Sequence, residues 1–281
     1  MSIIDLTQLP PPDVVEALDF ERIYQDMLSG FRASMGEGWN AALESDPVVK
    51  LLQLAAYREL QVRARVNDAA RANLIAFAEG GDLDHAAAFY NVERLRDEAG
   101  QEEDDERLRL RTQLRVAALA ANGTPEQYRH VALSASLEVR DAGIMPSPPG
   151  SVALAVWPQS GADAGAVLAD VRRAFAADDA KPLGVPLSVA LALPRAVDVT
   201  ATVYRESTAP PDLVARLREA LPPQIAAHAR LGRDVPASWI SSRLHAQGVS
   251  RVQLDSGGVA VAPNEYAAAG AIQVLDGGVA W

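Results

Sequence analysis

The sequence contains no cysteine and only four histidines in 281 residues. These absences exclude a disulfide framework, a zinc–thiolate site and a catalytic cysteine, and they argue against a histidine-rich metal site. Basic residues are also scarce, because 26 Lys and Arg stand against 37 Asp and Glu, a formal charge of −11. Proteins that bind the nucleic-acid backbone depend on clustered Lys and Arg, so a nucleic-acid partner is not expected.

Aromatic residues make up only 5% of a chain that is 49% apolar. The core must therefore consist mainly of Ala, Val and Leu, which favour closely packed helices. No apolar run reaches the length of about 20 residues that a membrane span needs, so no membrane partner is expected. The start, MSIIDLTQLPPPD, has neither the basic nor the apolar region of a signal peptide. Together with the lack of cysteine, this predicts a soluble protein of a reducing compartment.

The periodicity of the chain predicts an α+β fold. A helical segment with a long helix precedes two small α+β domains that resemble split βαβ units. The predicted division is an extended N-terminal arm at 1–18, a helical segment at 19–96, a middle α+β domain at 97–195 and a C-terminal α+β domain at 196–281. In the arm, apolar residues alternate with polar ones and either pack on their own domain or reach a neighbour; these candidate contacts are Ile3, Ile4, Leu6 and Leu9.

Two helices are predicted before Gly80. One runs from Phe20 to Met35 and ends at Gly36 and Gly38. The second begins at Asp46-Pro47, where Asp caps free N–H groups and Pro at the first helical position loses no hydrogen bond. Its pattern continues to Gly80-Gly81, about 33 residues, which is longer than most helices of globular proteins.

The long helix carries an apolar seam with alternating spacings of four and three residues, interrupted by two polar positions. The seam consists of Val48, Leu52, Ala55, Glu59, Val62, Val66, Ala69, Asn73 and Ala76. Such a heptad pattern is typical of a helix that bundles with another helix, and its polar positions set register and partner choice. A long helix lying across its own domain is the alternative. We favour partner binding, because no second helix of similar length is predicted in this chain.

The rest of the chain alternates between short helices and strands. Asp82 is predicted to cap a helix through Tyr90, and the acidic tract Asp97–Glu106 is interpreted as a solvated linker or helix start rather than a cation site. Further helices are predicted near residues 107–121, 124–133, 164–177, 211–230 and 237–247, and strands near residues 137–139, 152–156, 185–193, 197–204 and 249–254.

No motif for catalysis, metal binding or cofactor binding is found. The spacings of a phosphate-binding glycine loop, a hydrolase nucleophile elbow and a zinc protease helix are all absent. Asp82 and Asp84 are explained by helix capping, which leaves His85 without a partner ligand. The two helices between residues 211 and 247 suggest a helix–turn–helix, but the second has few DNA-contacting side chains. Packing through Trp239, Ile240 and Leu244 is the better interpretation.

Several stretches are similar to the baseplate J-like proteins of contractile-tailed phages, and the similarity covers nearly the whole chain. It is most specific between residues 44 and 95, and it is carried by Ile4–Pro10, Glu44–Gln53, Ala56–Glu59, Arg65–Ala70, Gly81–Asp84, Asn91–Leu95, Asp105–Arg111, Thr124–Tyr128, His228–Asp234 and Gly248–Val252. The segment before Glu44 is shorter than in relatives that carry an insert there.

This resemblance implies a structural wedge subunit with no catalytic residues and no cofactor. It implies N-terminal helices that bundle with a second copy and a different wedge protein, and C-terminal domains that join neighbouring wedges around a central hub. Hub or sheath-initiating proteins are further expected partners. The expected location is the tail baseplate of a virion or bacteriocin-like particle, assembled in the host bacterial cytoplasm. A regulatory dimerising adaptor, or an enzyme with an acidic site in the C-terminal half, is the alternative function.

Overall fold

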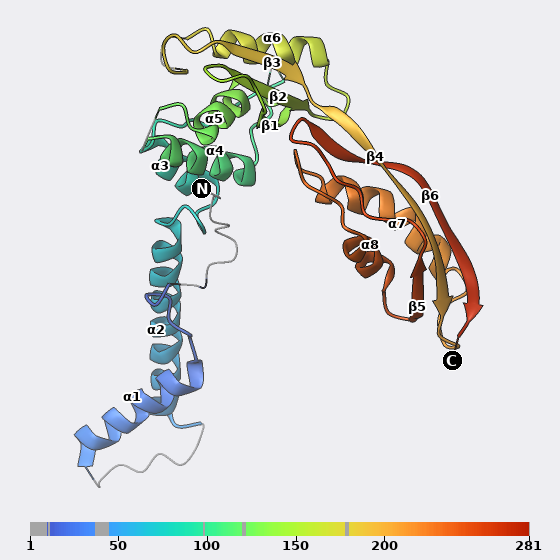
Figure 1. The fold of residues 1–281 in the computed structure, drawn as a ribbon. Coiled ribbons are helices and arrows are strands. Elements are labelled where there is room, and N and C mark those ends of the chain that lie inside the picture. Colours follow the sequence, from blue (N-terminus) through green and yellow to red (C-terminus); the bar gives the residue numbers. More distant parts are fainter. Residues whose placement is uncertain are drawn as a thin grey trace. The chain divides into compact units, whose positions relative to one another are not determined.

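A computed structural model describes residues 10, 12–36, 45–97, 99–119, 122–177 and 180–280 of the chain (Figure 1). The arm residues Ile3, Ile4, Leu6 and Leu9 lie outside this described part. The chain forms two compact units: the first combines Met1–Arg94 with Asp104–Thr112, and the second combines Leu95–Glu103 with Gln113–Trp281. The finer division into four segments stays a prediction.

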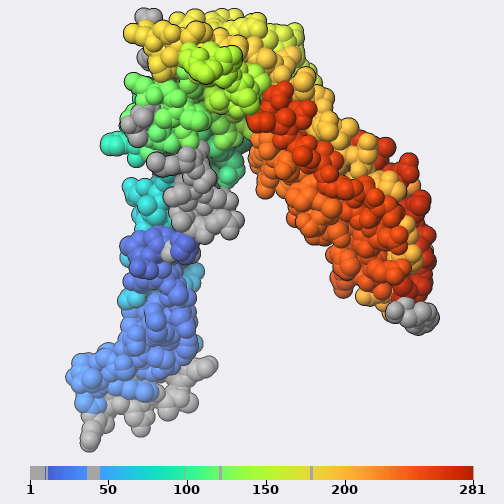
Figure 2. Space-filling model, viewed as in Figure 1, coloured from blue at the N-terminus to red at the C-terminus, as the bar shows by residue number. Residues whose placement is uncertain are grey.

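Helix α1 (Phe20–Met35) confirms the first predicted helix. The Asp19 carboxylate accepts the backbone N–H groups of Glu21 and Arg22 at 2.9 and 3.3 Å, which satisfies two donors at the helix start. Gly36, with φ of 68°, adopts the left-handed conformation that ends the helix, as predicted; Gly38 lies outside the described residues. The space-filling view shows α1 in blue against α2, with which it is in contact (Figure 2).

Helix α2 (Pro47–Ala72) begins where the sequence predicts, because the Asp46 side chain accepts the Val48 N–H at 2.7 Å. Its predicted extension to Gly80 is wrong: the helix has 26 residues and ends at Ala72. The chain then turns, and the carbonyls of Ile75 and Ala78 accept hydrogen bonds from Arg109, at 2.7 and 2.8 Å. A contact with a residue far along the chain therefore holds the turn that follows the helix.

Helix α3 (Gly80–Ala88) starts at the two glycines that were predicted to stop the preceding helix. The prediction that Asp82 caps it is also wrong. Glu79 is the N-cap residue without a side-chain hydrogen bond, and Asp82 lies in the first turn. The Gly80 N–H donates instead to the Asp105 carboxylate at 2.9 Å. Around α3, the first unit buries a small apolar core of Ala78, Leu83, Ala87, Val92 and Leu108.

The second unit contains two three-stranded sheets, which confirm the α+β class (Figure 1). Helix α4 (Asp105–Ala118) leads into it, and α5 (Pro125–Ala135) starts at its Thr124 cap as predicted. In the first sheet, β1 (Val139–Met145) is antiparallel to β2 (Val152–Pro158). Helix α6 (Ala164–Ala174) connects β2 to the parallel strand β3 (Leu187–Leu191).

The second sheet has the order β5-β4-β6. Strand β4 (Leu193–Arg205) starts earlier than predicted and lies parallel to β6 (Glu265–Val279), a strand that sequence reasoning missed. Helices α7 (Leu213–His228) and α8 (Ala237–Leu244) lead to β5 (Val249–Leu254), which is antiparallel to β4. Apolar residues of β4, α7 and α8 make up most of the core of this unit.

The two sheets of the second unit are joined by aromatic contacts. Trp157 at the end of β2 stacks on Tyr266 of β6, with ring centroids 4.2 Å apart. The Arg140 guanidinium lies 4.1 Å from the centroid of the Trp157 ring and donates to the Ala226 carbonyl of α7. Stacking and cation–π attraction therefore connect both sheets and α7 through one tryptophan.

Candidate functional site

Helix α2 has one face that packs within the chain and one that is exposed. Val49, Ala56 and Asn67 are buried on the first face. On the other, Val62 is 59% and Val66 56% exposed. Large apolar side chains with this exposure mark a surface that another molecule covers when they form a continuous stripe.

The nine predicted seam residues differ in how far they are exposed. Ala55, Val62, Val66, Ala69 and Asn73 are exposed, and Val48, Leu52, Glu59 and Ala76 are partly buried. Because α2 ends at Ala72, Asn73 is its C-cap residue and Ala76 lies in the turn that follows. Seven of the nine predicted residues thus share the helix, and the exposed ones form what we call the α2 seam: Ala55, Val62, Val66 and Ala69.

The face turned inward is held by a polar contact that sequence reasoning missed. The Asn67 amide oxygen accepts the Glu16 N–H at 3.0 Å, and its amide nitrogen donates to the Glu16 carbonyl at 2.9 Å. Arg63 pairs with Glu59 and, at 3.3 Å, with Glu16. The hydrogen bond and charge of Glu59 raise the pKa of Arg63. These contacts join Glu16, in the segment before α1, to Asn67 and Arg63 of α2.

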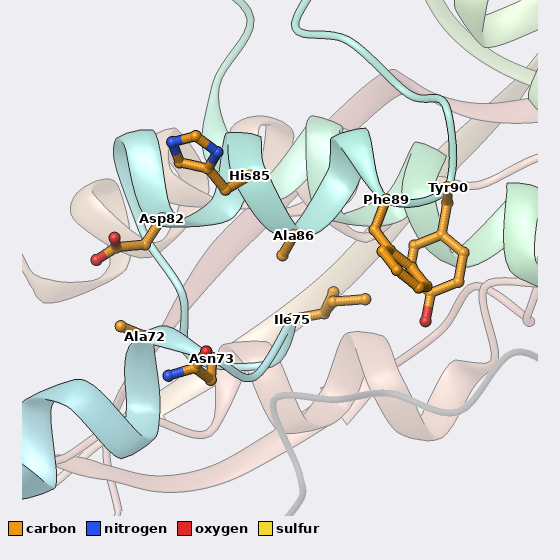
Figure 3. Close-up of a pocket in the computed structure, with 8 residues that line it drawn as sticks. All are labelled: Ala72, Asn73, Ile75, Asp82, His85, Ala86, Phe89 and Tyr90. Atoms are coloured by element: carbon orange, nitrogen blue, oxygen red, sulfur yellow. The ribbon is translucent and has the colours of Figure 1, made fainter.

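An open pocket of about 440 Å³ lies where α2 ends (Figure 3). It lies between the end of α2 with its following turn and helix α3, and its lining consists of Ala72, Asn73, Ile75, Asp82, His85, Ala86, Phe89 and Tyr90. Figure 3 places Asp82 and His85 near one end and the two aromatic rings near the other. Phe89 is 85% exposed. In the described part of the chain, no group of three His, Asp or Glu residues is placed to hold a metal ion.

The last residues of the acidic tract, Asp104, Asp105 and Glu106, lie at the start of α4, as one of the two interpretations of the tract predicted. The Asp104 carboxylate accepts the Arg107 N–H at 2.8 Å, which caps the helix. Asp105 accepts the Gly80 N–H, and both Asp105 and Asp84 bind Arg94 at 2.7 Å. The pKa of Asp105 is lowered, first by the Gly80 N–H and then by Arg94. These carboxylates therefore have a structural explanation.

The helices considered for DNA binding are packed as predicted. Ile240 and Leu244 of α8 are fully buried, and Trp239 stacks on His228 with 4.3 Å between ring centroids. Burial lowers the pKa of His228, and the nearby Arg233 lowers it further. Separately, none of the described helices is both long and apolar enough to cross a membrane.

Comparison with known proteins identifies the family. Residues 44–100 match the family model of the baseplate J-like N-terminal domain. The chain is 36% identical over 274 residues to baseplate protein J of Escherichia phage P2. The alignment covers 90% of this chain and 90% of that protein. The chain belongs to the baseplate J-like family. Membership confirms the resemblance stated from the sequence and gives the chain a structural role in the tail baseplate.

A solved structure is also similar to this baseplate J-like chain. It is the cryo-EM structure of the anti-feeding prophage baseplate, 6-fold symmetrised, at 16% identity and a TM-score of 0.34. The match covers 89% of this chain and 53% of that one, so the chain spans about half the length of this structural relative.

Proposed function

We propose that this baseplate J-like chain is a wedge subunit. It assembles through α2 with a second copy and with other tail proteins, and its C-terminal half joins neighbouring wedges into a ring around the central hub. The observation that carries the proposal is the α2 seam, an exposed apolar stripe that lies beside the face of the helix already covered within the chain.

The energetics of the seam favour a bound state. Val62 and Val66 lie four residues apart on one side of α2, and each leaves more than half of its surface in water. Full burial of a valine contributes on the order of 1.5 kcal/mol or more. A partner helix that inserts side chains between them removes this surface from water, as in other helical bundles.

The remaining parts of the proposal rest on the sequence. The arm residues Ile3, Ile4, Leu6 and Leu9 are proposed to contact a neighbouring subunit. The roles of hub and sheath-initiating proteins as partners follow from the family resemblance. The same holds for the ring formed by the C-terminal half.

The test replaces Val62 and Val66 together with Asp in the full chain, co-expressed with the other tail proteins of its particle. We expect the double variant to fold, because both side chains are exposed, and to be absent from the assembled complex. Circular dichroism measures whether the variant folds, and native mass measurement shows whether it is present in the complex. The control is Leu54→Asp with Gln61→Asp, which introduces the same two charges at exposed α2 positions that lie beside the seam rather than on it.

The control should assemble like the original protein. Normal assembly of the seam variant would remove the support for the proposal. A stable dimer that forms alone and ignores the tail proteins would instead favour the adaptor function.

A further inference from the structure

The charges beside the α2 seam indicate what kind of helix binds there. Helix α2 carries five cationic and two anionic side chains, Lys50, Arg58, Arg63, Arg65 and Arg71 against Glu59 and Asp68. The chain as a whole has a charge of −11. Positive charge is therefore concentrated on this helix, and its placement relative to the seam decides what it does.

Arg58 and Arg65 lie on the free flank of the seam. They are seven residues apart, and each directly precedes a residue of the predicted heptad series, Glu59 or Val66. In heptad terms both occupy the flanking position that sets partner choice through charge. Both are exposed. Arg58 donates only to the neutral Gln61, at 3.0 Å, and neither arginine forms an ion pair within the described part of the chain.

On the opposite flank of the seam, the one charged side chain is already paired within the chain. The heptad positions of this flank are Ala56, which is fully buried, Arg63, which pairs with Glu59 and Glu16, and Ala70. Partner selection by charge therefore falls to Arg58 and Arg65.

A second α2 does not complement these two arginines. In a parallel pair, the flanking position of one helix faces the opposite flank of the next heptad, so Arg58 meets Arg63 of the second copy. In an antiparallel pair the two free flanks face each other, and arginine meets arginine. Neither arrangement supplies an unpaired carboxylate, because Glu59 and Glu16 are already paired with Arg63. Like charges in contact weaken binding.

We infer that the helix that binds the α2 seam comes from a different protein and carries Asp or Glu beside its own apolar seam. This inference rests on the proposed function and makes it more specific, since the second copy then joins the wedge through this acidic helix rather than through direct contact between two α2 seams. Complementary charge also speeds encounter between partners.

The probes are two synthetic peptides with the same leucine–valine heptad seam, one with Glu and one with Lys at both flanking positions. Binding to the full chain is measured by fluorescence anisotropy at about 0.05 M and about 0.5 M salt, which differ in electrostatic screening. We expect the Glu peptide to bind roughly fivefold more tightly at low salt, since two exposed ion pairs supply a difference of this order. At high salt the difference should shrink.

Charge reversal gives the decisive comparison. Arg58→Glu with Arg65→Glu should reverse the preference and favour the Lys peptide. The matched control, Lys50→Glu with Arg71→Glu, makes the same change in net charge at exposed positions on the side of α2 away from the seam. It should retain the preference for the Glu peptide. Circular dichroism checks that both variants stay helical.

Equal binding of the two peptides, no binding of either, or an unchanged preference after reversal overturns the inference. Those results leave the proposed function to its own test, because Val62→Asp with Val66→Asp measures assembly with the natural partners. Normal assembly of that variant would overturn the proposed function instead.

Discussion

Asn67 and Glu16 are joined by two hydrogen bonds, in which the side-chain amide of one pairs with the backbone N–H and C=O of the other at 3.0 and 2.9 Å. An asparagine side chain here does what a neighbouring strand does in a sheet. Asn67 is only 8% exposed, so these bonds are shielded from water. They fix the chain that leads into α1 against the C-terminal part of α2.

We predict that Asn67→Ala releases the segment before α1 and lowers the free energy of unfolding by about 1–3 kcal/mol, because both Glu16 backbone groups lose their partner. Hydrogen exchange at the Glu16 amide should rise. Asn73→Ala is the control, since Asn73 is exposed and donates only to the Ala69 carbonyl. Unchanged protection of Glu16 in Asn67→Ala would contradict the prediction.

Arg109 is predicted to be irreplaceable by lysine. Its guanidinium binds two backbone carbonyls, those of Ile75 and Ala78, and its side chain is 8% exposed. Lysine lacks the planar fork that serves both acceptors. We expect Arg109→Lys to cost about 2 kcal/mol in urea unfolding. Glu106→Gln also removes a partner of Arg109, but Glu106 is 75% exposed, so its effect should stay within about 1 kcal/mol.

Gly258 is predicted to tolerate no side chain. A Cβ at this position would lie 2.8 Å from the Ala237 nitrogen and 3.1 Å from the Pro236 Cα, so the backbone must shift. We expect Gly258→Ala to destabilise the protein by about 2 kcal/mol. A Cβ on the neighbouring Gly257 would meet nothing within 4 Å, and Gly257→Ala should lie within about 0.5 kcal/mol of the original protein. Equal thermal midpoints for the two variants would refute the steric explanation.

Asp105 is predicted to make stability depend on pH in acid. Its pKa is lowered in the folded chain by the Gly80 N–H and then by Arg94, whereas an unfolded aspartate titrates at about 3.9. The unfolded chain therefore binds more protons between these two pKa values. The stabilisation is complete above the unfolded value and is lost as the pH falls through the folded value.

Asp105→Asn should accordingly be less stable than the original protein at neutral pH, and the difference should narrow below about pH 4. Urea unfolding at several pH values measures this. A difference that stays constant down to pH values well below the unfolded pKa would show that the carboxylate charge is not responsible.

The sequence predicts helix starts better than helix ends in this protein. Asp19 and Asp46 cap helices by hydrogen bonds to residues two or three positions away, so a short stretch of sequence is enough to predict where each helix starts. The turn that follows α2 is held by Arg109, which contacts Ile75 across 34 residues and therefore leaves no local signal in the sequence. Strand β6 was missed because its Ala- and Gly-rich sequence has little strand preference, and it forms by pairing with β4.

The candidate site shows the same limit. A heptad pattern identifies apolar positions on α2, but it does not tell which side of the helix the rest of the chain covers. Val49 and Ala56 repeat after seven residues as regularly as Val62 and Ala69 do. Only the contacts of α1 and Glu16 with α2 separate the covered face from the exposed one.

The sharing of α4 between the two units has a consequence for synthesis on the ribosome. The core of the first unit includes Leu108, and its α2–α3 turn is held by Arg109, yet both residues follow a stretch that belongs to the second unit. The nascent first unit therefore completes only after the start of α4 has emerged. Until then the α2 seam is exposed, and the turn after α2 lacks its hydrogen bonds to Arg109. A partner helix present during translation would therefore bind the first unit before it has finished folding.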